Sequence, residues 1–581
     1  MSDLNIARKN INEIFSNHKT KFLIPDYQRP YSWTIEHCET LWEDLKEFSF
    51  PNDDAESFDE DKDEYFLGTI LTFNNEYGQN EVIDGQQRLI TLLLLLRAFY
   101  ESFGELKNRT RDRISACIWQ IGNDDNPDLS SCKIIYEVVG DEKKDNFIKI
   151  ITEGLADKND KSNYAENYRY FQKKIDDFKL TAPDNFSIFP KRILDNCILL
   201  PIETNSQSTA LRIFTTLNDR GMPLSDSDIF KAQFYKFYKH QGKNAKENFV
   251  QHWQELERLC NKNFHPRRGT SLDDLFMRYM YYAKTKRAIE KNTRISDTFS
   301  DMRDFYAEDS YKILFKAETF NDLKVLAKFW DNIANRNEKF SLEVLKKLYI
   351  LNYSPYSVWS YIVSVYFLSN RDSENNLDEE KFCHFLDKVT AMILMNAVLD
   401  LGKSNIRRPF VLELKNIFYG NPLEFNIQFK PQENILSRRL SEMTFSNSKS
   451  ITRAMLAWWT FRDTAQELPP IDTRLEIEHI YAVRRNDFSP LNDDKNLERL
   501  GNKVLLEKRI NIRASDYRFE DKKKYYLGYT KGRQEIQGTM IRELRNIAET
   551  KEDFSEKDIL KRNEKIFSAF IEYLAQNNLL R

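Results

Sequence analysis

The chain has 581 residues, of which 41% are hydrophobic and 30% charged, so we expect a globular protein with more than one hydrophobic core. The formal net charge of −3 disfavours a protein that coats DNA through bulk positive charge, although it is compatible with an enzyme that engages DNA through one groove. The six cysteines form no CxxC pair, which disfavours a disulfide framework or a cysteine zinc site and favours a reducing compartment.

The first part of the chain, up to Asp84, is predicted to form helices and one hairpin. The N-terminus, MSDLNIARKN, lacks the apolar segment of a signal peptide, so we expect a cytoplasmic protein. The acidic run over 53–64 is interpreted as a solvated loop. The periodicity predicts a helix, an extended segment, a second helix and a hairpin, over 6–15, 21–33, 34–48 and 64–84 respectively.

Gly85 ends the second strand of this hairpin, and 86–100 is predicted to form a buried helix. The segment Asp84–Arg88 therefore lies at a strand–turn–helix junction. The apolar run within the helix, around Leu92–Leu96, is too short to span a bilayer, so no membrane partner is expected.

The rest of the chain is predicted to be mainly helical, after a strand over 197–204. A helix over 208–217 ends at Gly221, and Ser225 or Asp226 caps the next helix. Two prolines in 466–472 end the helical region. A short strand, an apolar run and a final helix follow, over 476–481, 500–508 and 556–574. These breaks predict three domains, over 1–240, 241–454 and 455–581.

His479 is the centre of a candidate catalytic pattern. It follows Glu478 near the end of a predicted strand, and Asn502 and then Asn511 come later in the chain. Phosphodiester hydrolysis requires a base and a cation; imidazole titrates near neutral pH, and amide and carboxylate oxygens suit Mg²⁺ or Mn²⁺. A lone histidine beside acids is usually a satisfied or surface residue, so only the combined spacing favours catalysis.

This order resembles the HNH, or ββα-metal, nuclease motif, and in particular the C-terminal domain of the GmrSD-type modification-dependent restriction family. The matching residues are Glu478–His479, Leu500–Asn502, Leu505–Leu506, Asn511, Phe519 and Lys522–Tyr526. By this resemblance His479 is the base, and Asn502 orients either the base or its loop.

The resemblance makes Glu478 and Asn511 the metal-ligand candidates for Mg²⁺ or Mn²⁺. The candidates for DNA phosphate contacts are Lys503, Arg509 and Arg513. The sequence departs from the family at Ala482–Arg484, where Pro–Gln is common, and at Ser515–Asp516, where a second Asn is common. These departures bear on the metal ligands more than on the base.

Four N-terminal motifs resemble the first domain of the same family, whose fold is similar to ParB and sulfiredoxin. They are Ile24–Trp33 (IPDYQRPYSW), Tyr65–Gly68 (YFLG), Ile83–Leu89 (IDGQQRL) and Phe214–Leu224 (FTTLNDRGMPL). The resemblance implies that this domain binds and hydrolyses a nucleoside triphosphate, and it leaves the base open. The chain has no GxxxxGK[ST] P-loop, so it is not an ordinary Walker ATPase.

The predicted nucleotide site lies at the strand–turn–helix junction. Glycine allows close backbone approach, a new helix offers free N–H groups, and arginine adds a bidentate donor. A capped turn with an arginine salt bridge is the alternative for this motif taken alone. The candidate nucleotide-binding residues are Asp84, Gly85, Gln86, Gln87, Arg88, Asn218, Arg220 and Lys231.

Tyr27, Gln28 and Arg29 are the candidate DNA-binding residues of the first domain. Tyr27, Tyr31 and Trp33 could stack on a base or line a cavity for modified DNA. Aromatic residues around a proline-bounded strand are as well explained as core packing, so both interpretations stay open.

We therefore expect a predominantly helical α+β protein with a ParB/sulfiredoxin-like N-terminal domain, a helical connector, and a helical C-terminal domain that carries the HNH motif. The expected function is an NTP-regulated, metal-dependent DNA endonuclease of phage defence that restricts modified or foreign DNA. The alternatives are an NTP-dependent DNA-binding regulator with an inactive HNH fold, and a toxin-like RNase. The expected partners are DNA and a nucleoside triphosphate, and a homo-oligomer stays open.

Overall fold

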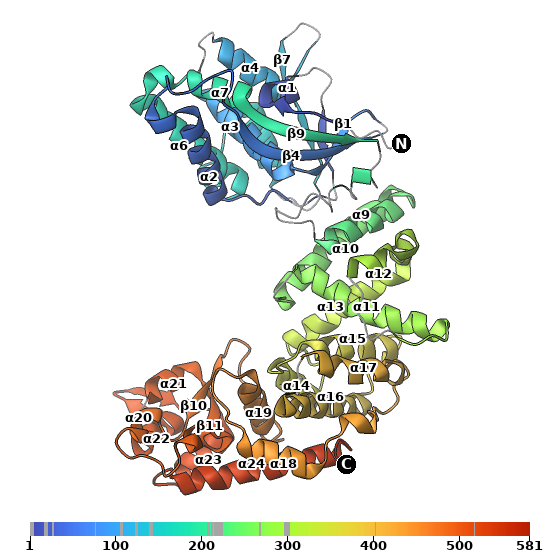
Figure 1. The fold of residues 1–581 in the computed structure, drawn as a ribbon, viewed down its shortest axis with the longest axis vertical. Helices are drawn as coiled ribbons and strands as arrows, with labels where there is room; N and C mark the ends of the chain where they lie inside the picture. The colour runs from blue at the N-terminus through green and yellow to red at the C-terminus, as the bar shows by residue number, and fades with distance from the viewer. Residues whose placement is uncertain are drawn as a thin grey trace. The chain divides into compact units, whose positions relative to one another are not determined.

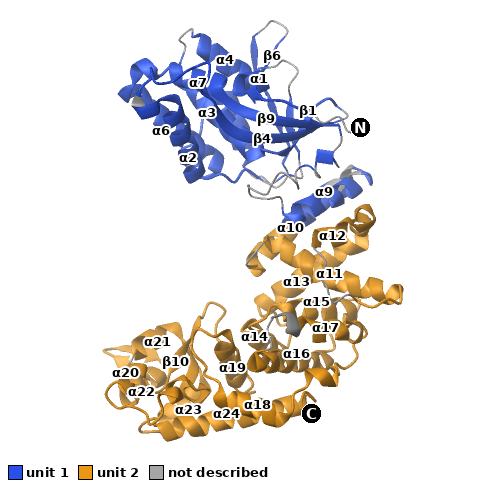
Figure 2. Cartoon of the chain, viewed as in Figure 1, with its two compact units in different colours: residues 1–254 blue, residues 255–581 orange. Residues whose placement is uncertain are grey.

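A computed structural model gives the fold of the chain (Figure 1). It describes the whole chain except residues 1–4, 17–20, 26–27, 29, 76, 105–107, 123–125, 139–142, 206–208, 211–212, 214–224, 267–268, 296–301, 401–402 and 516. The described residues form two compact units, 1–254 and 255–581 (Figure 2). Both units are rich in helices, and unit 1 also contains a mixed sheet, so the expected predominantly helical α+β class is confirmed.

Unit 1 is built on a seven-stranded sheet with the order β1-β9-β4-β5-β3-β8, in which β2 also pairs with β9. The long strands β4 and β9 are parallel, and β4 and β5 form the predicted antiparallel hairpin. The strands are β1 (Asn5–Ile6), β2 (Lys9–Asn10), β3 (Phe22–Ile24), β4 (Tyr65–Asn74), β5 (Asn80–Asp84), β8 (Ile134–Tyr136) and β9 (Cys197–Thr204).

The predicted helix over 6–15 is wrong in its first half. Residues 5–6 and 9–10 pair with β9, which comes much later in the chain, and only Ile11–Phe15 forms a helix, α1. Long-range strand pairing therefore overrides the local apolar periodicity. The predicted strand over 197–204 is confirmed and supplies the partner.

One face of the sheet packs against the main core of unit 1, around α3. Leu89 to Leu96 are almost fully buried in α3, which also packs against α4 and α6. Successive strand residues point to opposite faces, so Ile70 joins this core whereas Leu71 joins a smaller cluster with Ile83. The helices are α2 (Ile35–Ser49), α3 (Gln86–Ser102), α4 (Arg109–Ile118), α5 (Lys144–Glu153), α6 (Asn163–Thr181), α7 (Ile188–Asn196) and α9 (Asp226–Lys239).

The predicted caps of unit 1 are partly tested by the structure. Ser225 caps α9 with a full capping box, as the sequence indicates. The predicted cap at Gly221 and most of the predicted helix over 208–217 lie outside the described residues. A small ribbon of β6 (Trp119–Ile121) and β7 (Pro127–Cys132) completes unit 1, and α10 (Lys243–Asn263) crosses the boundary between the units.

Unit 2 begins with the predicted helical span. Its helices are α11 (Ser271–Glu290), α12 (Met302–Ala307), α13 (Ala317–Ala334), α14 (Leu342–Asn352), α15 (Val358–Asn370), α16 (Glu379–Leu399), α17 (Lys403–Phe418), α18 (Glu433–Glu442) and α19 (Ser450–Phe461). Among the described residues, α16 is long and apolar enough to cross a membrane, but 72% of its apolar window is buried inside the unit. It packs against α14, α18, α19 and α24, which is typical of a core helix.

The last part of unit 2 holds a two-stranded ribbon surrounded by short helices (Figure 1). The non-helical break over 466–472 and the final helix are confirmed, the latter as α24. A single apolar cluster joins the ribbon to these helices. The elements are β10 (Leu475–His479), α20 (Val483–Asn486), β11 (Lys503–Glu507), α21 (Lys508–Ala514), α22 (Phe519–Leu527), β12 (Gly528–Lys531), β13 (Gln534–Gln537), α23 (Arg542–Thr550) and α24 (Glu556–Gln576).

Candidate functional site

The ribbon of β10 and β11 places His479 directly opposite Lys503 at one end of the strands. The two residues are a cross-strand pair, so their side chains share one face. His479 Nε2 lies 3.2 Å from Glu498 Oε1, and Lys503 donates to Glu498 Oε2 at 2.8 Å and to Asn447 Oδ1 at 2.7 Å. The side chain of His479 is 15% exposed to solvent, so water can reach the imidazole ring.

The electrostatics of this cluster favour a neutral imidazole. Burial, followed by the positive charge of Lys503, lowers the pKa of His479 to about 4, although Glu498 opposes the shift. Burial opposes ionisation of Glu498, but the hydrogen bond and charge of Lys503 and the contact with His479 lower its pKa below the ordinary value. At neutral pH the cluster therefore holds an unprotonated histidine beside an ionised glutamate.

Asn502 organises the turn that follows His479. Its Oδ1 accepts from Tyr481 N at 2.7 Å, and its Nδ2 donates to the carbonyl oxygens of Tyr481 and Leu497 at 3.1 Å. The side chain is fully buried. Of the two roles expected for Asn502, the described contacts match the one in which it orients the loop.

Gly501 lies where α24 crosses this turn. A Cβ atom on Gly501 would overlap the carbonyl oxygen of Ile559 and would lie 2.8 Å from Asn563 N. Arg562 donates to the carbonyl oxygens of Leu500, Gly501 and Lys503. The LGN motif, Leu500–Asn502, is therefore the place where α24 packs against this turn.

Glu478 points to the opposite face of β10 from His479 because successive strand residues alternate. It is buried, and its Oε1 accepts from Lys522 Nζ at 2.7 Å and from Tyr526 Oη at 2.5 Å, both on α22. Lys522 also donates to the carbonyl oxygen of His479 at 2.7 Å. This ion pair fixes α22 against the strand that carries the histidine.

The second metal-ligand candidate, Asn511, lies on α21 beside Glu476, and its Nδ2 donates to Glu476 Oε2 at 3.4 Å. Glu476 and Glu478 share one face of β10, so two carboxylates and one amide are presented along the same face. Such a donor set has the oxygen chemistry that Mg²⁺ or Mn²⁺ prefers, but Lys522 and Tyr526 already engage Glu478, and this face of β10 is the one opposite His479. Among the described residues no group of three or more His, Cys, Asp or Glu side chains forms a metal cluster.

The three residues predicted to contact DNA phosphates differ in their exposure to solvent. Lys503 has no exposed surface and is engaged by Glu498 and Asn447, so its position does not suit a contact with DNA. Arg509 is exposed and Arg513 is half-buried on α21, next to the ribbon. The sequence could not separate these cases, because burial of a lysine requires an acidic partner from elsewhere in the chain.

The predicted nucleotide motif of unit 1 lies at the junction of β5 and α3. Gly85 has φ +92°, a left-handed conformation that glycine adopts without strain, and it is the residue before the helix begins. Arg88 donates to Thr69 O at 2.9 Å, and its guanidinium lies directly over Gly68. The YFLG and DGQQR motifs therefore meet. The Arg88 guanidinium fits against β4 because Gly68 has no side chain at that position.

Glutamine side chains connect this junction to the IPDYQRPYSW motif. Gln87 accepts from Ser32 N at 2.8 Å and donates to Pro30 O at 3.2 Å. Gln28 is buried and donates to the carbonyl oxygens of Val82 and Ile83, both at 3.1 Å. The structure thus brings three of the four N-terminal motifs together, with the glutamines as structural links.

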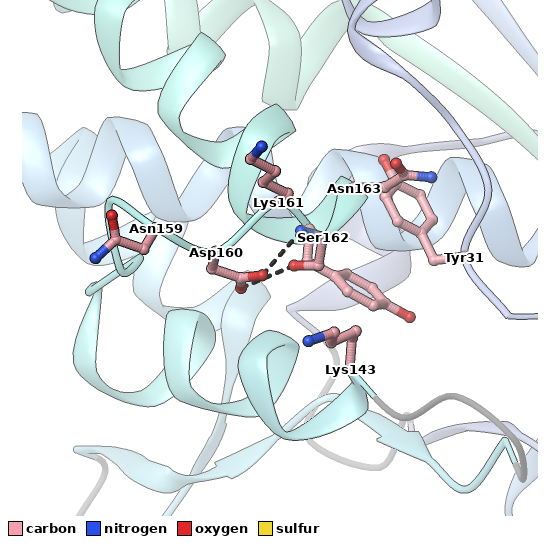
Figure 3. Close-up of a pocket in the computed structure, with 8 residues that line it drawn as sticks. Tyr31, Lys143, Asn159, Asp160, Lys161, Ser162 and Asn163 are labelled. Atoms are coloured by element: carbon pink, nitrogen blue, oxygen red, sulfur yellow. Dashed lines mark hydrogen bonds between the residues drawn. The ribbon is translucent and has the colours of Figure 1, made fainter.

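Tyr31 has features of both interpretations of its motif, since it packs in the core and also borders a pocket. Its hydroxyl is buried between Thr91 and Asn167, and its ring stacks on Tyr164 at 4.9 Å, as expected for a core aromatic. It also borders a pocket of about 490 Å³ at the start of α6 (Figure 3). The remaining lining residues are Lys143, Asn159, Asp160, Lys161, Ser162, Asn163 and Tyr164.

The other predicted residues of unit 1 are distributed as follows. Asp84 ends β5, and Gln86 is buried in the first turn of α3. Lys231 lies on α9 with its ammonium 5.9 Å from the centre of the Trp253 ring. The candidates Tyr27, Arg29, Asn218 and Arg220 lie outside the described residues.

Comparison with known proteins matches both ends of the chain to one family. The family model described as "GmrSD restriction endonuclease, N-terminal domain" matches residues 11–235, and "GmrSD restriction endonucleases, C-terminal domain" matches residues 430–569. Together they cover more than half of the chain. The chain belongs to the GmrSD restriction endonuclease family. No curated protein matches it.

The GmrSD match gives a coarse function for the chain. Membership of this family identifies the chain as a restriction endonuclease of phage defence, and its substrate as DNA. The C-terminal match includes the whole His479 cluster, and the N-terminal match includes the junction of β5 and α3.

Two residues of the GmrSD site, Glu498 and Arg562, were missed by the sequence analysis. Glu498 lies in a polar loop between the two strands of the ribbon, where no periodicity marks it. Arg562 lies beside the apolar stripe of α24 and was not distinguished from surface arginines. Lys522 and Tyr526 belong to a run that the family resemblance marked, and the structure gives them a common partner in Glu478.

Acid is expected to destabilise this GmrSD enzyme partly through His479. Because its folded pKa is about 4 and its ordinary value 6.5, the folded state binds fewer protons than the unfolded state between these values. Its contribution to stability is therefore complete above pH 6.5 and is lost as the pH falls toward 4. Urea unfolding should show a steeper loss between pH 7 and 5 for wild type than for His479→Gln, and parallel curves would contradict the assignment.

Substitution of Gly68 is expected to disturb the arginine of the nucleotide motif. Gly68 has φ +123°, and an added Cβ would lie 2.9 Å from Arg88 Cζ. Gly68→Ala should cost about 1–3 kcal/mol through backbone strain and should also displace the guanidinium. Gly78→Ala is the control, because Gly78 also has a positive φ (+70°) but no heavy atom within 4 Å. Urea unfolding that gives equal losses for both variants would contradict the close packing.

Proposed function

We propose that this restriction endonuclease is a cytoplasmic enzyme that hydrolyses DNA phosphodiesters at the His479 cluster and that nucleotide binding in unit 1 regulates it. The observation that carries the proposal is a solvent-reachable imidazole that contacts Glu498 at the end of a two-stranded ribbon, next to a turn that Asn502 holds. A base of this kind accepts a proton from water as the water attacks phosphorus.

The residues around the base divide the remaining tasks. Asn502 and Gly501 hold the turn, and the Glu478–Lys522 pair holds the strand, so the imidazole has little freedom to move. Arg509 and Arg513 supply positive charge on α21, where the DNA backbone would be held. Their loss should weaken binding to all DNA sequences and reduce its dependence on salt.

We further propose that Mg²⁺ or Mn²⁺ is required and is held by Glu478 and Asn511, with Glu476 beside them. The shared face of β10 and the oxygen chemistry of the three side chains support this assignment. Because that face is opposite His479, the substrate phosphate would have to lie at the end of the strand to meet both the ion and the imidazole. When bound, such an ion stabilises the negative charge on the phosphate and the leaving oxygen. Chelation with EDTA should abolish cleavage, and full activity in EDTA would refute the requirement.

For unit 1 we propose a nucleoside triphosphate site at Asp84–Arg88. The first turn of any helix has backbone N–H groups that the helix itself does not pair, and Arg88 donates only one of its five N–H groups to a hydrogen bond within the described residues. Sensing of modified DNA is proposed for the pocket beside Tyr31, which offers two tyrosines and two lysines. The candidates Asn218 and Arg220 of the same domain remain part of the proposal.

The proposal is tested by cleavage of modified and unmodified phage DNA across a panel of NTPs and divalent metals. Wild type and Arg88→Ala are compared with and without NTP, and Arg109→Ala, an exposed arginine of α4, is the control. NTP should change the rate for wild type and Arg109→Ala only. Equal activity of Arg88→Ala and wild type in every condition would refute nucleotide regulation.

A further inference from the structure

Glu498 is held in place by both its backbone and its side chain. Phe445 N donates to the Glu498 carbonyl oxygen at 2.8 Å. The two carboxylate oxygens have different partners, since Oε1 lies 3.2 Å from His479 Nε2 and Oε2 accepts from Lys503 at 2.8 Å. The carboxylate is therefore fixed at one particular nitrogen of the ring.

The chemistry of the pair determines where the imidazole carries its hydrogen. Lys503 is completely buried, and its ammonium adjoins the carboxylate, which favours the ionised form of Glu498. An ionised carboxylate can only accept a hydrogen bond, and a neutral imidazole has one N–H. The nitrogen that faces Glu498 must therefore be the donor, and the other nitrogen keeps its lone pair.

We infer that Glu498 is a positioning residue, which holds His479 as the Nε2–H tautomer and leaves Nδ1 to take the proton from water. Lys503 takes part by anchoring the carboxylate to Asn447. Among the described residues no side chain or backbone group hydrogen-bonds to Nδ1, whereas the ring keeps 15% of its side-chain exposure. The inference rests on the proposed function of His479 as the base.

A purely structural ion pair between Glu498 and Lys503 would have different consequences. Its loss would lower the free energy of unfolding, but it would not select between the two imidazole nitrogens. The tautomer of His479 is therefore the property that separates the two roles, because only an oriented hydrogen bond sets it.

The test is Glu498→Gln in the full chain labelled with ¹⁵N-histidine. The amide keeps the shape of the side chain but presents two N–H donors, one of which can donate to Nε2 and favour the Nδ1–H form. The chain has seven histidines, and the signal that His479→Ala removes identifies the ring. We expect Nε2–H in wild type and a shift toward Nδ1–H in Glu498→Gln. Single-turnover cleavage should fall by about 10²-fold or more, with DNA affinity within about twofold of wild type.

Glu556→Gln is the matched control. Glu556 starts α24 and accepts from Asn492 N at 2.9 Å and from Asn496 Nδ2 at 2.7 Å, so it holds the same loop without touching His479. Its substitution should lower the unfolding midpoint and leave the tautomer unchanged. An unchanged tautomer in a folded Glu498→Gln, or an equal shift in Glu556→Gln, would overturn the inference. Retained cleavage by His479→Ala would instead refute the proposed base, whereas the NMR result would still show whether Glu498 orients the ring.

Discussion

Replacement of His479 by alanine is expected to reduce DNA cleavage by about 10²–10⁴-fold, the usual contribution of a general base. Burial favours the neutral imidazole, which water can reach and Glu498 holds, and the substitution removes the proposed proton acceptor without removing the α21 arginines proposed to hold DNA. DNA affinity should therefore stay close to wild type. Single-turnover cleavage and fluorescence anisotropy, measured on the same preparations, separate the two effects.

His384→Ala is the control for this experiment, because His384 is an exposed histidine on α16. It should cleave like wild type. Full activity of His479→Ala would contradict the base assignment, and absence of cleavage in wild type under all metals would favour the DNA-binding regulator. A preference of wild type for RNA over DNA, tested in parallel, would favour the toxin-like RNase.

Replacement of Gly501 by alanine is expected to disrupt the last part of unit 2, around the ribbon of β10 and β11, rather than a single contact. The new Cβ would overlap the backbone of α24 at Ile559, and backbone cannot move aside as a flexible side chain can. Overpacking of a core usually costs about 1–3 kcal/mol and occasionally more, and an overlap with backbone places this case at or above that upper end. Urea unfolding of the full chain should therefore show a lower midpoint, and cleavage should be lost with it.

Gly532→Ala provides the comparison for Gly501→Ala. Gly532 lies in the turn between β12 and β13 with φ +66° and no heavy atom within 4 Å, so its substitution costs only local strain of about 1 kcal/mol. Equal unfolding midpoints for the two variants would show that α24 does not pack on the LGN turn as described.

The sequence predicted those elements whose signals are local. The hairpin of β4 and β5, the glycine before α3 and the capping box at Ser225 all depend on residues within a few positions of each other. The first strands were not predicted, because residues 5–10 acquire their conformation from β9, at the other end of the sequence that forms the sheet.

The same distinction applies to the candidate site. His479 and Asn502 were identified by spacing along the chain, and the structure brings them to the same turn. Glu498 could not be identified, because its role depends on a contact across a loop rather than on its own neighbours. Lys503 was predicted to contact DNA phosphates, whereas the described network buries it completely.

The segment between α18 and α19 touches the Glu498 cluster at two points. Phe445 binds the backbone of Glu498, and Asn447 binds the ammonium of Lys503. A shift of about 1 Å in this segment would weaken both bonds, because hydrogen bonds weaken steeply with distance and angle. The geometry around His479 therefore depends on how α18 and α19 pack, as well as on the two strands of the ribbon.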